Sequence, residues 1–163
     1  TITSTTYIPP HIPLDSMAFG PPPGDPNESL ASMSCFLSDP PIELNYYRFL
    51  VGTNSAPLES GVSSIAEDVF FDGKSFEFQL LNPVTSNGDV EPDVFGLYFV
   101  GDTETLKWAF IDGETFDFWN TAELAKANEG PFSSYTRIKS NIEGGIGVWT
   151  GYSISYYTQI VEY

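Results

Sequence analysis

Short alternating segments are the feature that most constrains the fold of this chain. In ASMSCFLSD, Met33, Cys35 and Leu37 alternate with serines, and in LNYYRFLVGT every second residue from Tyr47 to Val51 shares one face. A period of two is typical of a β-strand with one buried face. Both segments are therefore predicted as strands, with the Met33 and Tyr47 faces turned toward a core.

Turn residues divide the rest of the chain into short pieces. The 14 glycines and 13 prolines make up about a sixth of the 163 residues, above the usual share of about 12%. Asp72-Gly73 lies between apolar runs in VFFDGKSFEFQLL, and Gly101-Asp102 separates VFGLYFV from TETLKWAFI. Each pair predicts a β-hairpin, because such turns need positive φ, which glycine adopts easily. The closing YSISYYTQIVEY is a further predicted strand.

One segment, DGETFDFWNTAELAKANEGP, switches to a helical pattern. Asp112 is the predicted N-cap, Glu114 suits the positive end of the helix dipole, and Lys126 before Gly130-Pro131 marks the exit. The expected packing face consists of Phe118, Trp119, Ala122 and Ala125. The chain as a whole is thus expected to be mainly β, a β-sandwich-like domain with one short α-helix near residues 113–128.

Residues 1–29 differ from the remainder. TITSTTYI is rich in β-branched residues and predicts a strand that ends at Pro9-Pro10. The proline-rich stretch after it is expected to be a linker, and residues 30–163 a β-rich domain. The chain begins without an initiator Met, a signal peptide or an apolar run of about twenty residues. We therefore expect a piece of a longer protein, whose upstream β domain contributes residues 1–8 as its last strand.

Charge argues against several classes of partner. Six Lys+Arg residues against 22 Asp+Glu residues give a formal net charge of −16. Such a chain repels polyanions. Nucleic acid and acidic lipid surfaces are therefore not expected as partners, and any membrane association would depend on an upstream lipid anchor.

The usual catalytic residue sets are missing. The one histidine, His11, lies in the proline-rich stretch, and the one cysteine, Cys35, lies in a predicted strand. They cannot supply a zinc tetrad or a serine-hydrolase triad. We predict a protein that is not an enzyme and needs no cofactor. A weak hydrolase that uses two carboxylates, with Asp112 and Asp117 as the candidate pair, stays open.

The glycine-rich stretch NIEGGIGVWTGYS needs its own interpretation. Gly145, Gly147 and Gly151 have the spacing G-x-G-x-x-x-G, a strand follows, and the stretch contains no basic residue. A dinucleotide or phosphate loop needs a different spacing and a following helix. We therefore predict a backbone bend before the last strand. The residues assigned structural roles are Asn141, Gly144, Gly145, Gly147, Asp72, Gly73 and Asp112.

Two groups of residues could bind a ligand. Trp149 and Tyr152, beside the glycines, could form a stacking platform for a sugar. Asp89, Glu91 and Asp93 in NGDVEPD are weaker candidates for a calcium site, because the run lacks the spacing of a known calcium loop.

Several segments together resemble a known family. They are TTYIPPHIPLDSMAF, DPPIELNYYRFLV, FFDGKSFEF, GDTETLKWAFIDGETFDFW and SNIEGGIGVWTGY. In this order and spacing the chain resembles the C-terminal portion of the domain-of-unknown-function family DUF4249, and its most specific part is NIEGGIG at residues 141–147.

The resemblance implies a location more than an activity. Members of that family look like envelope lipoproteins of Bacteroidetes-type bacteria, with an N-terminal signal, a lipidated cysteine and an upstream β-rich domain. They are suspected of working beside TonB-dependent transporters. Cys35 does not match the lipidated cysteine, because no apolar signal precedes it. The family offers no established catalytic residues to carry over.

We therefore expect a non-catalytic module of the cell envelope, anchored to the outer membrane in the full-length protein. Its expected role is to bind a protein partner or to help an outer-membrane transporter capture a nutrient. A carbohydrate-binding module that uses Trp149 and Tyr152 is the alternative, and the carboxylate-dependent hydrolase is third.

Overall fold

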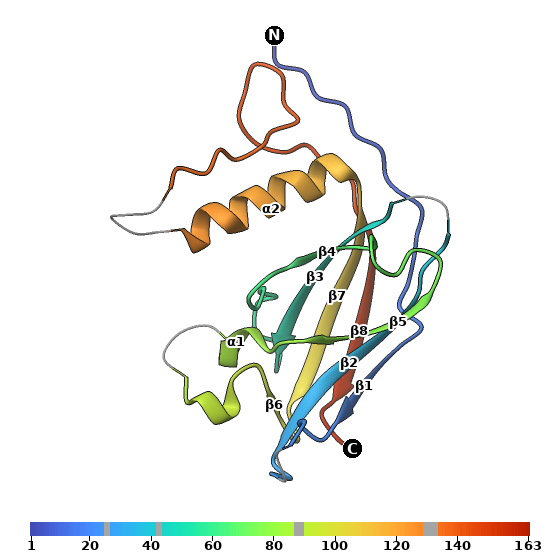
Figure 1. The fold of residues 1–163 in the computed structure, drawn as a ribbon, viewed down its shortest axis with the longest axis vertical. Helices are drawn as coiled ribbons and strands as arrows, with labels where there is room; N and C mark the ends of the chain where they lie inside the picture. The colour runs from blue at the N-terminus through green and yellow to red at the C-terminus, as the bar shows by residue number, and fades with distance from the viewer. Residues whose placement is uncertain (25–26, 42–43, 87–89, 129–133) are drawn as a thin grey trace.

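Two antiparallel sheets pack face to face in the part of the chain that the computed structural model describes, residues 1–24, 27–41, 44–86, 90–128 and 134–163 (Figure 1). The first sheet contains β1 (Ser16–Gly20), β2 (Leu30–Ser38), β5 (Ser75–Leu80) and β6 (Tyr98–Phe99). The second sheet has the order β4 (Ile65–Glu67), β3 (Tyr46–Thr53), β7 (Thr103–Ile111) and β8 (Ser153–Ile160). A long helix, α2 (Gly113–Ala127), and two short helices, α1 (Pro83–Ser86) and the 3-10 helix η1 (Pro92–Val94), complete the described elements. The expected class, mainly β with one helix of several turns, is confirmed.

The two alternating segments form central strands of this core. Met33, Cys35 and Leu37 on β2 are fully buried, as is Tyr47 on β3. Val51 is 3% exposed and belongs to the same cluster. The predicted inward faces are confirmed, because a strand between two neighbours can bury only alternate side chains against the opposite sheet.

The predicted hairpin at Asp72-Gly73 is wrong. β4 pairs with β3 in the second sheet, whereas β5 pairs with β2 in the first sheet. Residues before the glycine form a turn instead, in which the Phe71 and Asp72 amides donate to the Asp68 carbonyl at 2.8 and 2.9 Å. Gly73 does have positive φ, +68°. The turn therefore carries the chain from one sheet to the other.

The second predicted hairpin, at Gly101-Asp102, is wrong for the same reason. β6 pairs with β2, while β7 lies between β3 and β8. Gly101 has a φ of +96°, and its amide donates to the Val161 carbonyl at 2.9 Å. A positive-φ turn is compatible with a hairpin and with a crossing between sheets, so the local sequence does not distinguish them.

The N-terminal segment is neither the strand nor the linker that we expected. Residues 1–8 make one isolated β-bridge, between Thr3 and Glu143, and β1 forms inside the expected linker. The intervening chain packs along the second sheet. The Ile12 carbonyl accepts from Trp108 Nε1 at 3.0 Å, and the Leu14 amide donates to the Tyr157 hydroxyl at 2.8 Å. Proline-rich backbone is extended, so its free carbonyls and amides can bond to side chains of a neighbouring sheet.

Helix α2 begins and ends close to the predicted residues and packs on the outer face of the second sheet. Phe116, which lies outside the predicted face, contacts Tyr46 with a ring separation of 4.9 Å. The Arg48 guanidinium lies 3.5 Å from the Trp119 ring centre. Tyr46 and Arg48 are the residues of β3 that alternate with its core face, so α2 covers that outer side. No helix in the described residues is long and apolar enough to span a membrane.

Candidate ligand-binding site

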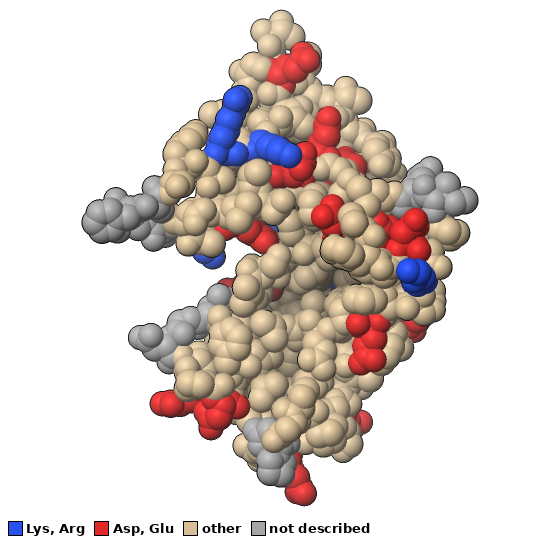
Figure 2. Space-filling view, in the orientation of Figure 1, with Lys and Arg blue, Asp and Glu red and all other residues tan. Residues whose placement is uncertain are grey.

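An apolar cleft opens between the two sheets, beside the edge strands β5 and β4. Its volume is about 270 Å³. Figure 2 shows that this face of the molecule is hollowed between its upper and lower parts. The aromatic residues that line the cleft come from both sheets and from the turn between them: Tyr47, Phe49, Phe71, Phe76, Phe78 and Trp108.

A run of nearly parallel rings forms one wall of the cleft. Ring centres lie 4.5 Å apart for Phe71 and Phe76, 6.3 Å for Phe76 and Phe78, and 5.5 Å for Phe78 and Trp108. The corresponding interplanar angles are 8°, 16° and 29°. We call these four residues the aromatic stack. Parallel rings present flat faces, on which another flat apolar group can stack.

Exposure increases from the floor of the cleft to its mouth. Trp108 and Tyr47 on the floor are 1% and 0% exposed, whereas Phe76 is 40% and Val62 is 67% exposed. Among the described lining residues, Glu59 is the one that carries a charge. Apolar surface that remains exposed at the mouth favours an apolar occupant.

A buried polar network lies next to the floor. The Tyr47 hydroxyl donates to Asp39 Oδ1. The amide and side-chain Nδ2 of Asn45 donate to Asp68 Oδ2 at 3.0 and 2.9 Å. Burial raises the pKa of the Tyr47 hydroxyl, and the bond to Asp39 raises it further. Burial also raises the pKa of Asp68, against the lowering effect of the Asn45 hydrogen bonds. Tyr47 therefore remains a neutral donor that ties the cleft to this network.

Comparison with known families identifies the chain. A family model described as "Domain of unknown function (DUF4249)" matches residues 1–158. The chain belongs to the DUF4249 family. No curated protein and no solved structure matches it significantly. The family assignment from sequence segments is thereby confirmed, and the site of this DUF4249 chain has to be interpreted from its own residues.

The two residues proposed for sugar stacking lie in different surroundings. Trp149 is 62% exposed. Tyr152 is half-buried, and its hydroxyl accepts from Trp119 Nε1 at 3.0 Å. Neither lines the apolar cleft. Trp149 therefore offers an accessible ring, whereas Tyr152 is held against α2.

The glycine-rich stretch forms a closed loop before β8. The Asn141 side chain donates to the Trp149 carbonyl at 2.8 Å and accepts from the Trp149 amide at 2.9 Å. Gly144 and Gly147 have φ of +76° and +138°, which other residues rarely adopt. A Cβ on Gly145 would lie 3.1 Å from the Ile142 side chain. Every one of these contacts lies within the chain.

The carboxylates considered for catalysis have structural partners. Asp112 is the N-cap of α2, accepting from the Thr115 amide and the Thr6 hydroxyl, each at 2.7 Å. Asp117 forms an ion pair of 2.7 Å with Lys139. Both line an open hollow beside the N-terminal segment. These partners give each carboxylate a structural role.

The calcium candidates of the NGDVEPD loop are only partly described. Asp89 lies outside the described residues. Glu91 and Asp93 are exposed, at the start of η1, and Glu91 makes no capping bond there. Within the described part of the chain, the acidic residues that come close enough to share an ion are Asp39, Asp68 and Asp72. The sequence does not mark these three as a group, because Asp39 lies 29 residues before Asp68 and the set matches no known calcium-loop spacing.

Proposed function

We propose that this DUF4249 chain is a non-catalytic binding module that holds a small, flat, apolar molecule in the cleft between its sheets. The aromatic-lined cleft is the observation that carries this proposal. A dry cavity of about 150 Å³ can hold benzene. The cleft here, at about 270 Å³, has room for a molecule of about two fused rings.

Charge indicates that the ligand is not anionic. The net charge of −16 repels anions at a distance, and Glu59 would repel a carboxylate at the cleft itself. Burying an unpaired charge among phenylalanine rings is costly in any case. The preferred ligand is therefore neutral, which distinguishes the cleft from a fatty-acid site.

The proposal includes a cellular setting, the bacterial envelope, where the full-length lipoprotein would present its ligand to an outer-membrane transporter. This part follows from the resemblance of the sequence to envelope lipoproteins. Fractionation of cells that express the full-length protein tests it. Recovery in the outer-membrane fraction is expected, and recovery in the cytosol would contradict the setting.

The binding prediction can be tested with N-phenyl-1-naphthylamine, a neutral fluorescent probe whose naphthyl group has the two fused rings that the cleft can hold. We expect probe emission to rise on binding and Phe76→Ala to weaken binding about tenfold, because this change removes a ring from the mouth. Phe99→Ala is the matched control, since Phe99 is 45% exposed, comparable to Phe76 at 40%, and lies outside the cleft. Equal effects of the two variants, or no binding by the wild type, would contradict the proposal.

A carbohydrate-binding function is the second candidate, favoured by the exposure of Trp149. Sugar rings stack on exposed tryptophan faces, and 62% of Trp149 is accessible. If a glycan binds there, intrinsic fluorescence should shift with soluble glycans in the wild type and not in Trp149→Ala. If no glycan shifts the fluorescence of either protein, the carbohydrate-binding function is contradicted. The proposal for the apolar cleft does not depend on this result.

A further inference from the structure

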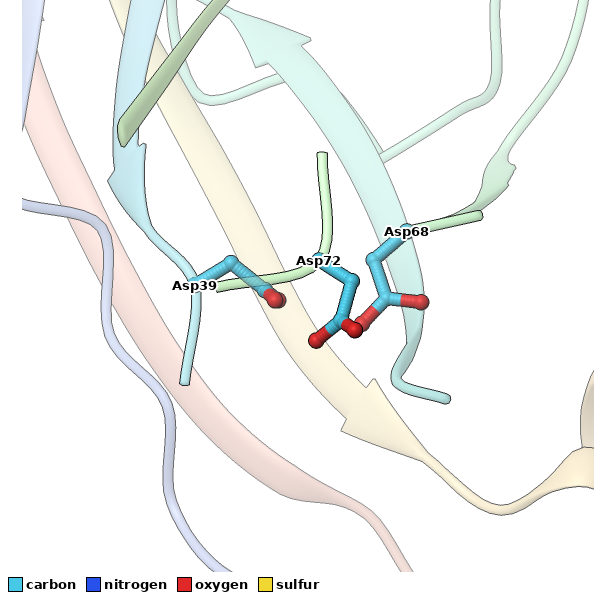
Figure 3. Close-up of side chains that lie close together, drawn as sticks. All are labelled: Asp39, Asp68 and Asp72. Atoms are coloured by element: carbon cyan, nitrogen blue, oxygen red, sulfur yellow. The ribbon is translucent and has the colours of Figure 1, made fainter. Parts of the chain in front are cut away.

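Three aspartates meet beside the floor of the cleft. Asp39 follows β2, while Asp68 and Asp72 belong to the turn between β4 and β5. One carboxylate oxygen of each lies within 4.8 Å of the others. Figure 3 shows the Asp68 and Asp72 carboxylates pointing toward one another, with Asp39 on the other side of Asp72. Since calcium–oxygen distances are about 2.3–2.6 Å, oxygens bound to one ion can be up to about 5 Å apart.

A second observation comes from Asp68 itself. Asp68 is 0% exposed, and its Oδ1 is buried without a hydrogen-bond partner in the described structure. Asp39 is only 6% exposed, and no Lys or Arg among the described residues forms an ion pair with either carboxylate. A buried anionic oxygen without a donor or a counter-charge is unfavourable. A cation next to Asp68 Oδ1 would coordinate this oxygen and supply the counter-charge.

Hydrogen bonds orient the two buried carboxylates, and both oxygens of Asp39 accept one, Oδ1 from the Tyr47 hydroxyl. The Gly73 amide donates to Asp39 Oδ2 at 3.0 Å, and Asn45 Nδ2 donates to Asp68 Oδ2 at 2.9 Å. Only glycine fits this position easily. Its φ is +68°, and the Cβ of any other residue would come 2.8 Å from the Pro41 side chain. Donors of this kind orient carboxylates in metal sites.

We propose that Asp39, Asp68 and Asp72 bind one calcium ion, which fastens the end of β2 to the turn between β4 and β5. An all-oxygen set of three carboxylates suits calcium, whereas zinc prefers nitrogen and sulfur ligands. Asp72 is exposed, so water can complete the coordination. The turn also carries Phe71 of the aromatic stack. Calcium would thus stabilise one wall of the cleft, whatever ligand the cleft holds.

The proposal is tested by titrating calcium into the chain after treatment with EDTA and dialysis. Calorimetry should show one ion bound per chain, and saturating calcium should raise the midpoint of thermal unfolding by at least about 5 °C, because the ion binds the folded state alone. Magnesium should give a smaller shift, since it retains its waters. No binding heat would overturn the proposal, and an equal shift with magnesium would overturn calcium as the ion.

Two matched variants locate the ion. Asp72→Asn should weaken calcium binding at least about 100-fold and change the midpoint of the calcium-free chain by less than about 2 °C, because Asp72 is exposed. Asp93→Asn makes the same charge change in the NGDVEPD loop and should leave binding unchanged. Unaltered binding by Asp72→Asn, or loss of binding in Asp93→Asn, would overturn this site.

Discussion

Replacing Trp108 with alanine is expected to lower the free energy of unfolding by about 3–5 kcal/mol. Trp108 is 1% exposed, and its ring stacks at 4.9 Å on Tyr47 and at 5.5 Å on Phe78. Those two rings belong to opposite sheets, so the variant leaves a void where the sheets meet. The Ile12 carbonyl also loses its indole donor. Urea unfolding followed by circular dichroism measures the loss.

Two further variants show how much of this loss comes from the indole N–H and how much from the burial of the ring. Trp108→Phe keeps a ring between the sheets and removes the indole N–H, so a smaller loss of about 1–2 kcal/mol is expected. Trp149→Ala removes the same residue type from a site that is 62% exposed and should cost less than about 1 kcal/mol. A Trp108→Ala loss as small as that of Trp149→Ala would show that the two sheets do not depend on this ring.

The sequence predicts which side of a strand is buried better than it predicts which strands pair. The alternation around Cys35 and Tyr47 follows from burial alone, and both faces are as expected. Pairing depends on contacts between distant segments. β2 pairs with β1, β5 and β6, and no local pattern near Asp72-Gly73 or Gly101-Asp102 indicates that the chain changes sheets there. The turn residues determine the backbone angle at glycine. They do not determine which strand the next strand pairs with.

The candidate site could be predicted only in part. Phe76 and Phe78 alternate in FEFQL, so a shared face is readable from the sequence. Their position against Trp108 of the other sheet cannot be read from the sequence, because it depends on how the two sheets pack. Asp39, Asp68 and Asp72 are likewise assembled by the fold from two separate turns. Local metal-binding spacing therefore indicates NGDVEPD and not these three aspartates.

Glu104 gives the second prediction of large effect, a stability that falls as pH rises. This residue is 0% exposed on β7, and its Oε1 has no hydrogen-bond partner among the described residues. Burial raises the pKa of Glu104 to about 7; the hydrogen bond from Thr53 opposes the shift and the charge of Asp102 adds to it. At Glu104 the folded state therefore binds more protons than the unfolded state between about pH 4.5 and 7. The stabilising contribution of Glu104 is complete below pH 4.5. As pH rises through this window, the free energy of unfolding should fall by about 3 kcal/mol.

Glu104→Gln should remove this dependence, because a neutral amide has no proton to lose. Relative to wild type, the variant should gain about 3 kcal/mol in unfolding free energy between pH 4.5 and 8. Glu77→Gln is the matched control, since Glu77 is an exposed strand glutamate, and its curve should run parallel to that of the wild type. The comparison is one of slopes. Any pH-independent cost of fitting the amide beside Thr53 cancels from the difference between slopes. Parallel curves for Glu104→Gln and wild type would mean that the buried carboxyl titrates at its ordinary pKa.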